Sequence, residues 1–163
     1  MKQVLWVEDL ARTDFGSIFG PVFASGRYDI QIAIDPTEAI VKLKEKEFAA
    51  VVIDIRLLPG NDKRWIDLYN KCGKNKALAQ LGIHLAQSLL RFPDAQIILK
   101  DSEIPEWITA NHIAFFSVEA WTEMEHHLLT LGITQEAFIE KGPLNKRDVL
   151  LRLIDSVTSR TSK

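Results

Sequence analysis

The sequence predicts an α/β fold: a doubly wound, parallel sheet of five strands with helices on both faces. Three observations support this prediction. Short β-branched runs alternate with longer segments whose apolar residues recur at helical spacing, the pattern of a parallel sheet covered by helices. The 163 residues suit one domain, and 47% of them are hydrophobic, enough for a single core. Acidic residues directly follow two of the short runs.

Three strands are expected in the first half of the chain. They cover residues 4–7, 28–34 and 49–53. The first and third are short, continuous apolar runs, as in buried parallel strands, and the second alternates like a strand. Between the first two, apolar residues at helical spacing over 15–23 indicate a helix that glycines and a proline weaken. The clearest helix start is Asp35-Pro36-Thr37-Glu38, with an N-cap, a proline at the first position and a capping-box glutamate.

The middle of the chain leaves the fourth strand open. A polar segment, residues 61–80, precedes an amphipathic helix over residues 81–90. Residues 95–99 and 113–116 are both strand-like and compete for the fourth place, with a short helix expected over 103–110. Residues 61–80 are expected to form a loop or an additional helix before that amphipathic helix.

The last third of the chain supplies one more strand between two helices. A helix over 121–131 ends at Gly132, the last strand covers 137–140, and Asn145 is expected to cap the final helix. The chain then divides into one domain, an insertion and a frayed tail: residues 1–158, residues 61–80 approximately with room for more within 95–117, and residues 159–163.

Composition excludes several functional classes. A formal net charge of -2 and a pI of about 6.1 provide no basic field, so we expect no direct partner among nucleic acids or membranes. Cys72 is the single cysteine, which excludes an intramolecular disulfide and disfavours a cysteine-based metal site. No apolar run is long enough for a membrane span or a signal peptide. We expect a cytoplasmic protein.

Charged residues follow the predicted strands. Glu8 and Asp9 follow the first strand, Asp54 the third and Lys141 the last. If the first and third strands are neighbours, three carboxylates meet at one edge of the sheet. Two carboxylates about 4 Å apart repel by roughly 4 kcal/mol at an effective dielectric of about 20, so the cluster requires a cation. Oxygen ligands with room for water and a phosphate suit Mg²⁺, and the lysine adds a second positive charge.

These residues resemble the response-regulator receiver domains of two-component signalling, the CheY-like family with a flavodoxin-like fold. Val-Leu-Trp-Val-Glu-Asp resembles the family's first strand with its acid pair, and Val-Val-Ile-Asp-Ile-Arg resembles the strand that bears the phosphoacceptor aspartate. Phe-Ile-Glu-Lys at 138–141 resembles the last strand, with an aromatic switch position and a lysine. The resemblance covers nearly the whole chain outside the insertion.

The resemblance implies a role for each charged residue. Asp54 is the implied phosphoacceptor, and Lys141 is implied to pair with the phosphate. The implied protein ligands of Mg²⁺ are Glu8 through a water molecule, Asp9 directly, Asp54, and the backbone carbonyl of Arg56.

The family also needs a serine or threonine that follows the phosphate at the end of the fourth strand. Ser117 fits best, because its separation from Lys141 matches the usual intervening helix. Ser102, after the alternative strand, is the second candidate. The residues two positions after the phosphoacceptor and after Ser117 are Arg56 and Glu119, and by resemblance they flank the path of attacking water. We expect these opposite charges to pair and to slow hydrolysis.

Three functional classes are compatible with these residues. The first is a receiver that takes a phosphoryl group from a histidine kinase or phosphotransfer protein and signals by binding a downstream protein. Such a receiver is a phosphoacceptor, and the only reactions that it catalyses are its own phosphotransfer and dephosphorylation. The second is a pseudo-receiver that binds partners without phosphorylation. The third is an aspartyl phosphatase of the haloacid dehalogenase group, which needs an aspartate where Arg56 stands. The complete residue set favours the first, and a homodimer is left open.

The insertion allows two interpretations. Residues 61–80 combine Trp65 with a basic cluster at Lys71, Lys74 and Lys76. This composition indicates either a surface for a partner or an additional helix packed on the domain.

Overall fold

The structure, a computed structural model, describes residues 1–9 and 15–162. Its five strands form one parallel sheet in the order β2-β1-β3-β4-β5, which confirms the predicted fold class. The strands are β1 (Lys2–Val7), β2 (Tyr28–Ala33), β3 (Ala50–Ile53), β4 (Ile113–Ser117) and β5 (Phe138–Glu140). The strand order reverses between β1 and β3, and open α/β sheets bind ligands at the carboxyl side of this point.

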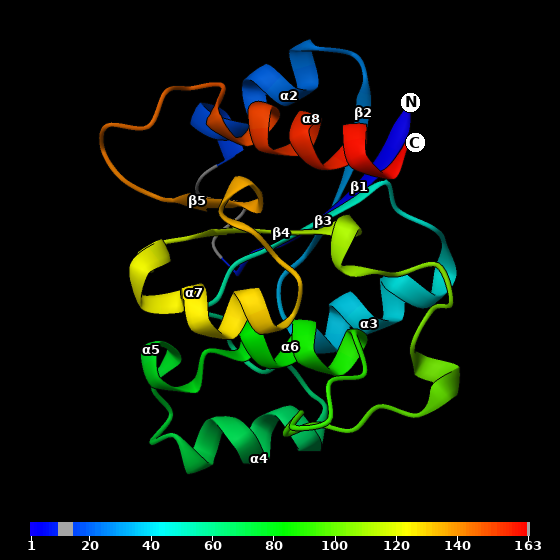
Figure 1. The fold of residues 1–163 in the computed structure, drawn as a ribbon, viewed down its shortest axis with the longest axis vertical. Helices are drawn as coiled ribbons and strands as arrows, with labels where there is room; N and C mark the ends of the chain where they lie inside the picture. The colour runs from blue at the N-terminus through cyan, green and yellow to red at the C-terminus, as the bar shows by residue number, and fades with distance from the viewer. Residues whose placement is uncertain (10–14, 163) are drawn as a thin grey trace.

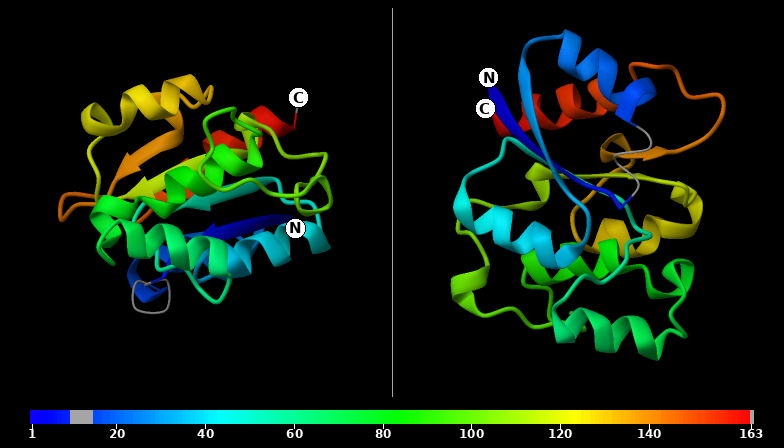
Figure 2. Two further views of the ribbon diagram at one scale, coloured as in Figure 1. Left: turned by 90° about the horizontal axis from the view of Figure 1, so that it is seen from below. Right: turned by 180° about the vertical axis from the view of Figure 1, so that it is seen from behind.

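Helices cover both faces of the sheet (Figures 1 and 2). One face carries α2 and α8, and the other carries α3, α6 and α7 (Figure 1). Their bounds are α2 (Gly20–Ala24), preceded by a π-helical turn (Phe15–Phe19), α3 (Pro36–Glu45), α6 (Leu81–Leu89), α7 (Trp121–Thr130) and α8 (Val149–Thr161). The two central strands are buried on both sides, which explains their continuous apolar sequences.

The register of the central strands sets the level of the residues that follow them. Val7 pairs with Ile53, so Glu8 and Asp54 leave the sheet side by side. The backbone N–H of Asp54 donates to the carbonyl of Val7 over 2.9 Å, which extends the ladder by one step. The backbone register of the sheet therefore places the Glu8 and Asp54 carboxylates close together.

Helix α3 begins as the sequence predicts. Asp35 is the N-cap, and its Oδ1 accepts a hydrogen bond of 2.8 Å from the backbone N–H of Glu38. Glu38 returns the bond one residue earlier than in a standard capping box, because its Oε2 accepts from the N–H of Ile34.

The insertion forms α4 (Lys63–Lys71) and α5 (Lys76–Ala79), and in Figure 1 α4 lies farther from the sheet than α6. Trp65 is fully buried. Of the two interpretations of the insertion, the structure supports a packed helix at this residue, while several neighbouring side chains of the insertion remain exposed.

Residues 95–99 do not form the strand that their pattern suggests. Ile97 and Leu99 are buried and Ile98 is 83% exposed, which is the alternation of a strand. The carbonyl of Ile97, however, accepts a hydrogen bond from the Ser88 hydroxyl over 2.6 Å instead of joining a ladder. The fourth place in the sheet belongs to β4. In place of the helix expected over 103–110, residues 104–109 are irregular and lie between two 3-10 turns, Asp101–Glu103 and Ala110–His112.

The end of the chain differs from the expectation in two respects. Asn145 does not cap the final helix: its Oδ1 accepts from the N–H of Gly142 over 2.7 Å and closes a loop, and α8 begins four residues later. Helix α8 also continues past residue 158 to Thr161, whose hydroxyl donates to the carbonyl of Ala49. Among the described residues, no helix is both long and apolar enough to cross a membrane.

The insertion is fastened by an arginine that lies between two acids. Arg64 donates to Asp62 and, through two nitrogens, to Glu103 over 3.0 and 2.8 Å. These hydrogen bonds lower the pKa of Glu103 to about 2. Because the folded pKa lies below the usual value of a glutamate, this pair stabilises the fold at neutral pH and loses its contribution as the pH falls toward 2.

We predict that Glu103→Gln lowers the free energy of unfolding by about 1 kcal/mol at pH 7, because it weakens a charge-assisted pair that is still partly exposed. Urea unfolding between pH 7 and 2.5 is the measurement. The variant should lose less stability on acidification than the parent chain, and exposed Glu106→Gln is the matched control. Parallel pH profiles for Glu103→Gln and the parent would show that the pair contributes nothing.

Candidate functional site

Three carboxylates meet at the point where the strand order reverses. Glu8 and Asp9 follow β1, Asp54 follows β3, and one oxygen from each lies within 4.8 Å of the others. Glu8 is fully buried and Asp54 is 5% exposed. The structure thus places together the acids that the sequence assigned to strand ends.

Lys141 reaches this cluster from the end of β5. Its Nζ donates to Glu8 Oε2 and lies 3.4 Å from Asp54 Oδ2. Its backbone N–H donates to the carbonyl of Ser117 over 2.7 Å, so the lysine is tied to the neighbouring strand. The ammonium group therefore links carboxylates from both central strands.

Burial makes the cluster electrostatically unfavourable without more positive charge. Burial, followed by the nearby Asp54 carboxylate, raises the pKa of Glu8 to about 8, although the Lys141 ammonium acts in the opposite direction. A buried carboxyl that retains its proton near neutral pH is expected where like charges crowd together. The site as a whole consequently favours an added cation.

Ser117 ends β4 and is fully buried. It pairs in the sheet with Glu140, the residue before Lys141, so the hydroxyl lies at the same edge as the lysine. Ser102 instead lies exposed in a 3-10 turn before β4. The structure therefore favours Ser117 over Ser102 as the residue that could follow a phosphate.

Arg56 and Glu119 form the pair that the sequence predicts. Arg56 Nε donates to Glu119 Oε1 over 2.7 Å. The glutamate side chain is 8% exposed and that of the arginine 40% exposed, while Val118 beside it is half-exposed. The backbone N–H of Arg56 also approaches Asp54 Oδ1 at 3.3 Å. The ion pair thus connects the loop after β3 with the loop after β4.

Lys76 is a member of the site that the sequence analysis missed. Its Nζ donates to Asp9 Oδ2 over 2.8 Å from α5 in the insertion. The two residues are 67 positions apart. In the sequence, Lys76 belongs only to a basic cluster with Lys71 and Lys74. No spacing in the sequence signals this contact, because the path of the insertion is set by tertiary packing.

The residues fit a hard divalent cation such as Mg²⁺. The donors are all oxygens, as this ion prefers. Asp9 Oδ1 is buried and has no hydrogen-bond partner among the described residues, a costly arrangement that a metal ion would relieve. Glu8, Asp9 and Asp54 would hold the ion, and the carbonyl of Arg56 stays a predicted fourth ligand.

Comparisons with known proteins agree with this geometry at the level of the fold. No family model and no curated protein matches the sequence. A CheY-like receiver domain protein from Methanospirillum hungatei JF-1 is 19% identical with a TM-score of 0.60, and the match covers 99% of this chain and 98% of that one. The receiver domain of the Francisella response regulator 1452 is 18% identical with a TM-score of 0.59, with 99% of both chains covered.

This chain has the fold of a CheY-like response-regulator receiver domain. A third similar structure is the receiver domain of the sensor histidine kinase PA1611 from Pseudomonas aeruginosa PAO1, which contains a magnesium ion coordinated in its active-site cleft. It is 16% identical with a TM-score of 0.55, and the match covers 97% of this chain and 98% of that one. At these identities the likeness establishes the fold alone.

The receiver fold is closely packed behind the candidate phosphoacceptor. Gly82, in the first turn of α6, donates its N–H to the carbonyl of Ile55 over 3.0 Å. A Cβ atom at this position would lie 2.0 Å from the backbone oxygen of Asp54. The approach requires glycine for reasons of space, and it fixes the start of α6 against the end of β3.

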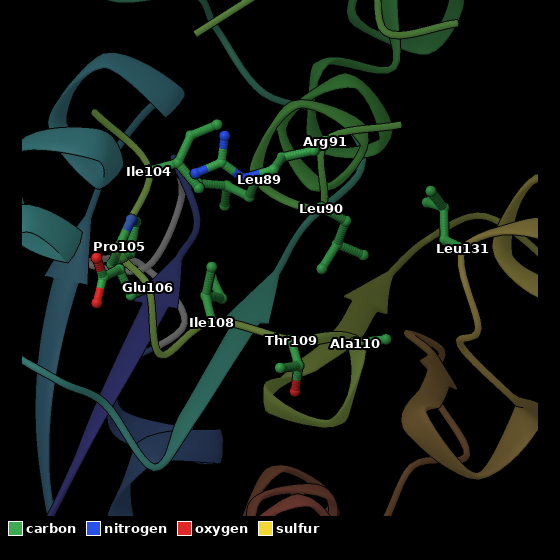
Figure 3. A pocket seen from close by; sticks show the side chains of 10 residues that line it. All are labelled: Leu89, Leu90, Arg91, Ile104, Pro105, Glu106, Ile108, Thr109, Ala110 and Leu131. Carbon is green, nitrogen blue, oxygen red and sulfur yellow. The ribbon is translucent and has the colours of Figure 1, made fainter. Parts of the chain in front are cut away.

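A separate cavity of about 530 Å³ lies near the opposite end of α6 (Figure 3). It is lined by residues 89–91 at the end of that helix, residues 104–106 and 108–110, and Leu131. These residues include the segment that leads into the amino end of β4, whereas the acids follow the carboxyl ends of the strands. The size of this cavity therefore does not identify the site, which the charged residues identify instead.

We predict that Gly82→Ala destabilises the protein by about 1–3 kcal/mol, because the added methyl group would force apart α6 and the end of β3. Urea unfolding gives the measurement, and Gly20→Ala is the matched control, since it lies in the first turn of another helix with open space around it. Equal stabilities of the two variants would contradict this packing.

Proposed function

We propose that this chain is a phosphoacceptor receiver domain of a two-component system, with Asp54 as the residue that takes the phosphoryl group. One observation carries the proposal: on a receiver fold, the three carboxylates lie within 4.8 Å of one another and Lys141 lies beside them. A histidine kinase or a phosphotransfer protein is the proposed donor.

The proposed reaction is a transfer between two side chains. A carboxylate oxygen of Asp54 attacks the phosphorus of a phosphohistidine, the P–O bond forms as the P–N bond breaks, and the imidazole leaves. Mg²⁺, when bound, supplies positive charge that offsets the charge of the phosphoryl oxygens. Its presence in the PA1611 receiver domain supports the same cofactor here.

The chain's own residues position the phosphoryl group. Lys141 already lies 3.4 Å from Asp54 Oδ2, so a short movement away from Glu8 would bring its ammonium to a phosphoryl oxygen. Ser117 is fully buried beside this lysine, and its hydroxyl is a donor for a second oxygen. We propose that rearrangement of these two residues alters the surface that a downstream protein binds.

A pseudo-receiver remains the second candidate, because the cluster already has internal cations. Lys141 contacts Glu8, and Lys76 contacts Asp9. Such pairs neutralise part of the negative charge of the carboxylates without a metal ion. A module that only binds partners would need this neutralisation, since it would bind no metal. Phosphorylation separates the two candidates.

We predict that the parent chain gains the mass of one phosphoryl group when incubated with Mg²⁺ and acetyl phosphate, and that Asp54→Asn abolishes this gain. Intact-protein mass spectrometry is the measurement. Asp29→Asn, which changes an exposed aspartate on β2, is the control and should be modified like the parent. A gain that persists in Asp54→Asn would contradict the assignment of the phosphoacceptor, and no gain in the parent would favour the pseudo-receiver.

We also predict slow loss of the phosphate, because the Arg56–Glu119 pair and Val118 obstruct the approach of water. Arg56→Ala, Glu119→Ala and Val118→Ala should each hydrolyse about twofold to tenfold faster, since a barrier change of about 1.4 kcal/mol corresponds to a factor of ten. The measurement is the decay of the phosphorylated mass after removal of the donor.

The control for this effect is Arg91→Ala, which removes a different, exposed arginine–aspartate pair. It should decay at the parent rate. Urea unfolding of the Arg56→Ala and Glu119→Ala variants accompanies the decay measurement, because Arg56→Ala leaves a glutamate side chain that is only 8% exposed without this ion pair. Decay at the parent rate in those two variants would show that the ion pair does not limit water access.

A further inference from the structure

Lys76 places a cation of the chain itself on a proposed metal ligand. Its Nζ lies 2.8 Å from Asp9 Oδ2, with the lysine side chain 34% exposed and the aspartate side chain 7% exposed. The lysine belongs to α5, in the insertion between β3 and α6. One partner of the pair is thus almost entirely withdrawn from water, which distinguishes it from an ordinary surface ion pair.

The backbone that carries Lys76 is held in place. Asn75 Oδ1 accepts hydrogen bonds from the N–H groups of Ala77 and Leu78, which fixes the first turn of α5. Ala79 at the end of that helix is fully buried. The next helix begins against the end of β3, where the N–H of Gly82 donates to the carbonyl of Ile55. The contact with Asp9 therefore follows from the packing of the insertion.

Lys76 and a divalent cation would compete for the carboxylate of Asp9. Lys141 forms ion pairs with Glu8 and Asp54. Arg56 is paired with Glu119. Lys76 is the cation that contacts Asp9 in the described structure. Within residues 1–9 and 15–162, Asp9 Oδ1 is buried without a hydrogen-bond partner. A divalent cation bound at this oxygen would lie within a few ångströms of the ammonium group, and like charges at such a distance repel strongly in a buried site.

We propose that Lys76 is a built-in competitor of the divalent cation: it occupies Asp9 in the metal-free receiver, lowers the affinity of the site for Mg²⁺, and leaves Asp9 when Mg²⁺ binds. The proposal rests on the proposed function in that it takes Asp9 as a metal ligand. Because linkage is reciprocal, a partner that draws the insertion and its lysine away from Asp9 would raise the affinity for Mg²⁺. Binding of a partner to the surface of the insertion would thereby change the affinity of the metal site for Mg²⁺.

Titration calorimetry of the unphosphorylated full chain with Mg²⁺ alone tests the proposal. Lys76→Gln should bind Mg²⁺ about threefold to tenfold more tightly than the parent, a change of up to about 1.4 kcal/mol. Lys76→Arg retains the charge and should bind like the parent. Lys71→Gln removes an equal charge from an exposed lysine of the same insertion and controls for the general field of the protein.

Two results would overturn the role of Lys76. One is an unchanged or weaker affinity in Lys76→Gln, and the other is an equal gain of affinity in Lys71→Gln, which would assign the effect to net charge instead of the contact. If the mass gain still requires Asp54 in that case, the proposed function stands and only this inference fails. Absence of Mg²⁺ binding in both the parent and Lys76→Gln would overturn the metal site, and the inference with it.

Discussion

The site on this receiver fold depends on one electrostatic constraint: three carboxylates converge at the carboxyl ends of β1 and β3, and the side chains of all three are nearly or fully buried. Buried like charges are tolerated only with compensating positive charge. The chain supplies it from two distant places, since Lys141 comes from the end of β5 and Lys76 from the insertion. Burial, followed by the neighbouring Asp54 carboxylate, raises the pKa of Glu8 to about 8, so added positive charge at this place would favour the ionised cluster.

The central sheet and most of the acid site could be predicted because their signals are local. Strands buried on both faces appear as continuous apolar runs, and an acid directly after such a run must lie at the edge of the sheet. The parallel register then brings Glu8 level with Asp54 without further information. Asp35 shows the same principle for a helix, because the cap and its partner are three residues apart.

The features that sequence reasoning missed depend on hydrogen bonds that the residue pattern does not show. Lys76 meets Asp9 only through the fold of the insertion, and the alternation at residues 95–99 resembles a strand although the Ser88 hydroxyl satisfies the carbonyl of Ile97. Asn145 has the residue type of a cap, yet its side chain closes a loop on Gly142. The partner of Lys76 lies 67 positions away, whereas the strand pattern at 95–99 and the cap expected at Asn145 lose to hydrogen bonds between residues nine and three positions apart.

The central claim is that this acid cluster holds a phosphoryl group on Asp54 with help from Mg²⁺ and Lys141. The most direct measurement is a crystal structure of the chain with Mg²⁺ and beryllofluoride, which mimics a phosphoryl group on a carboxylate. We expect beryllofluoride bound to Asp54, with Lys141 turned away from Glu8 toward the fluorine atoms of the beryllofluoride. We also expect Asp9 to bind the metal and to have lost its contact with Lys76. An acid cluster that binds neither group and keeps both lysine pairs under these conditions would contradict it.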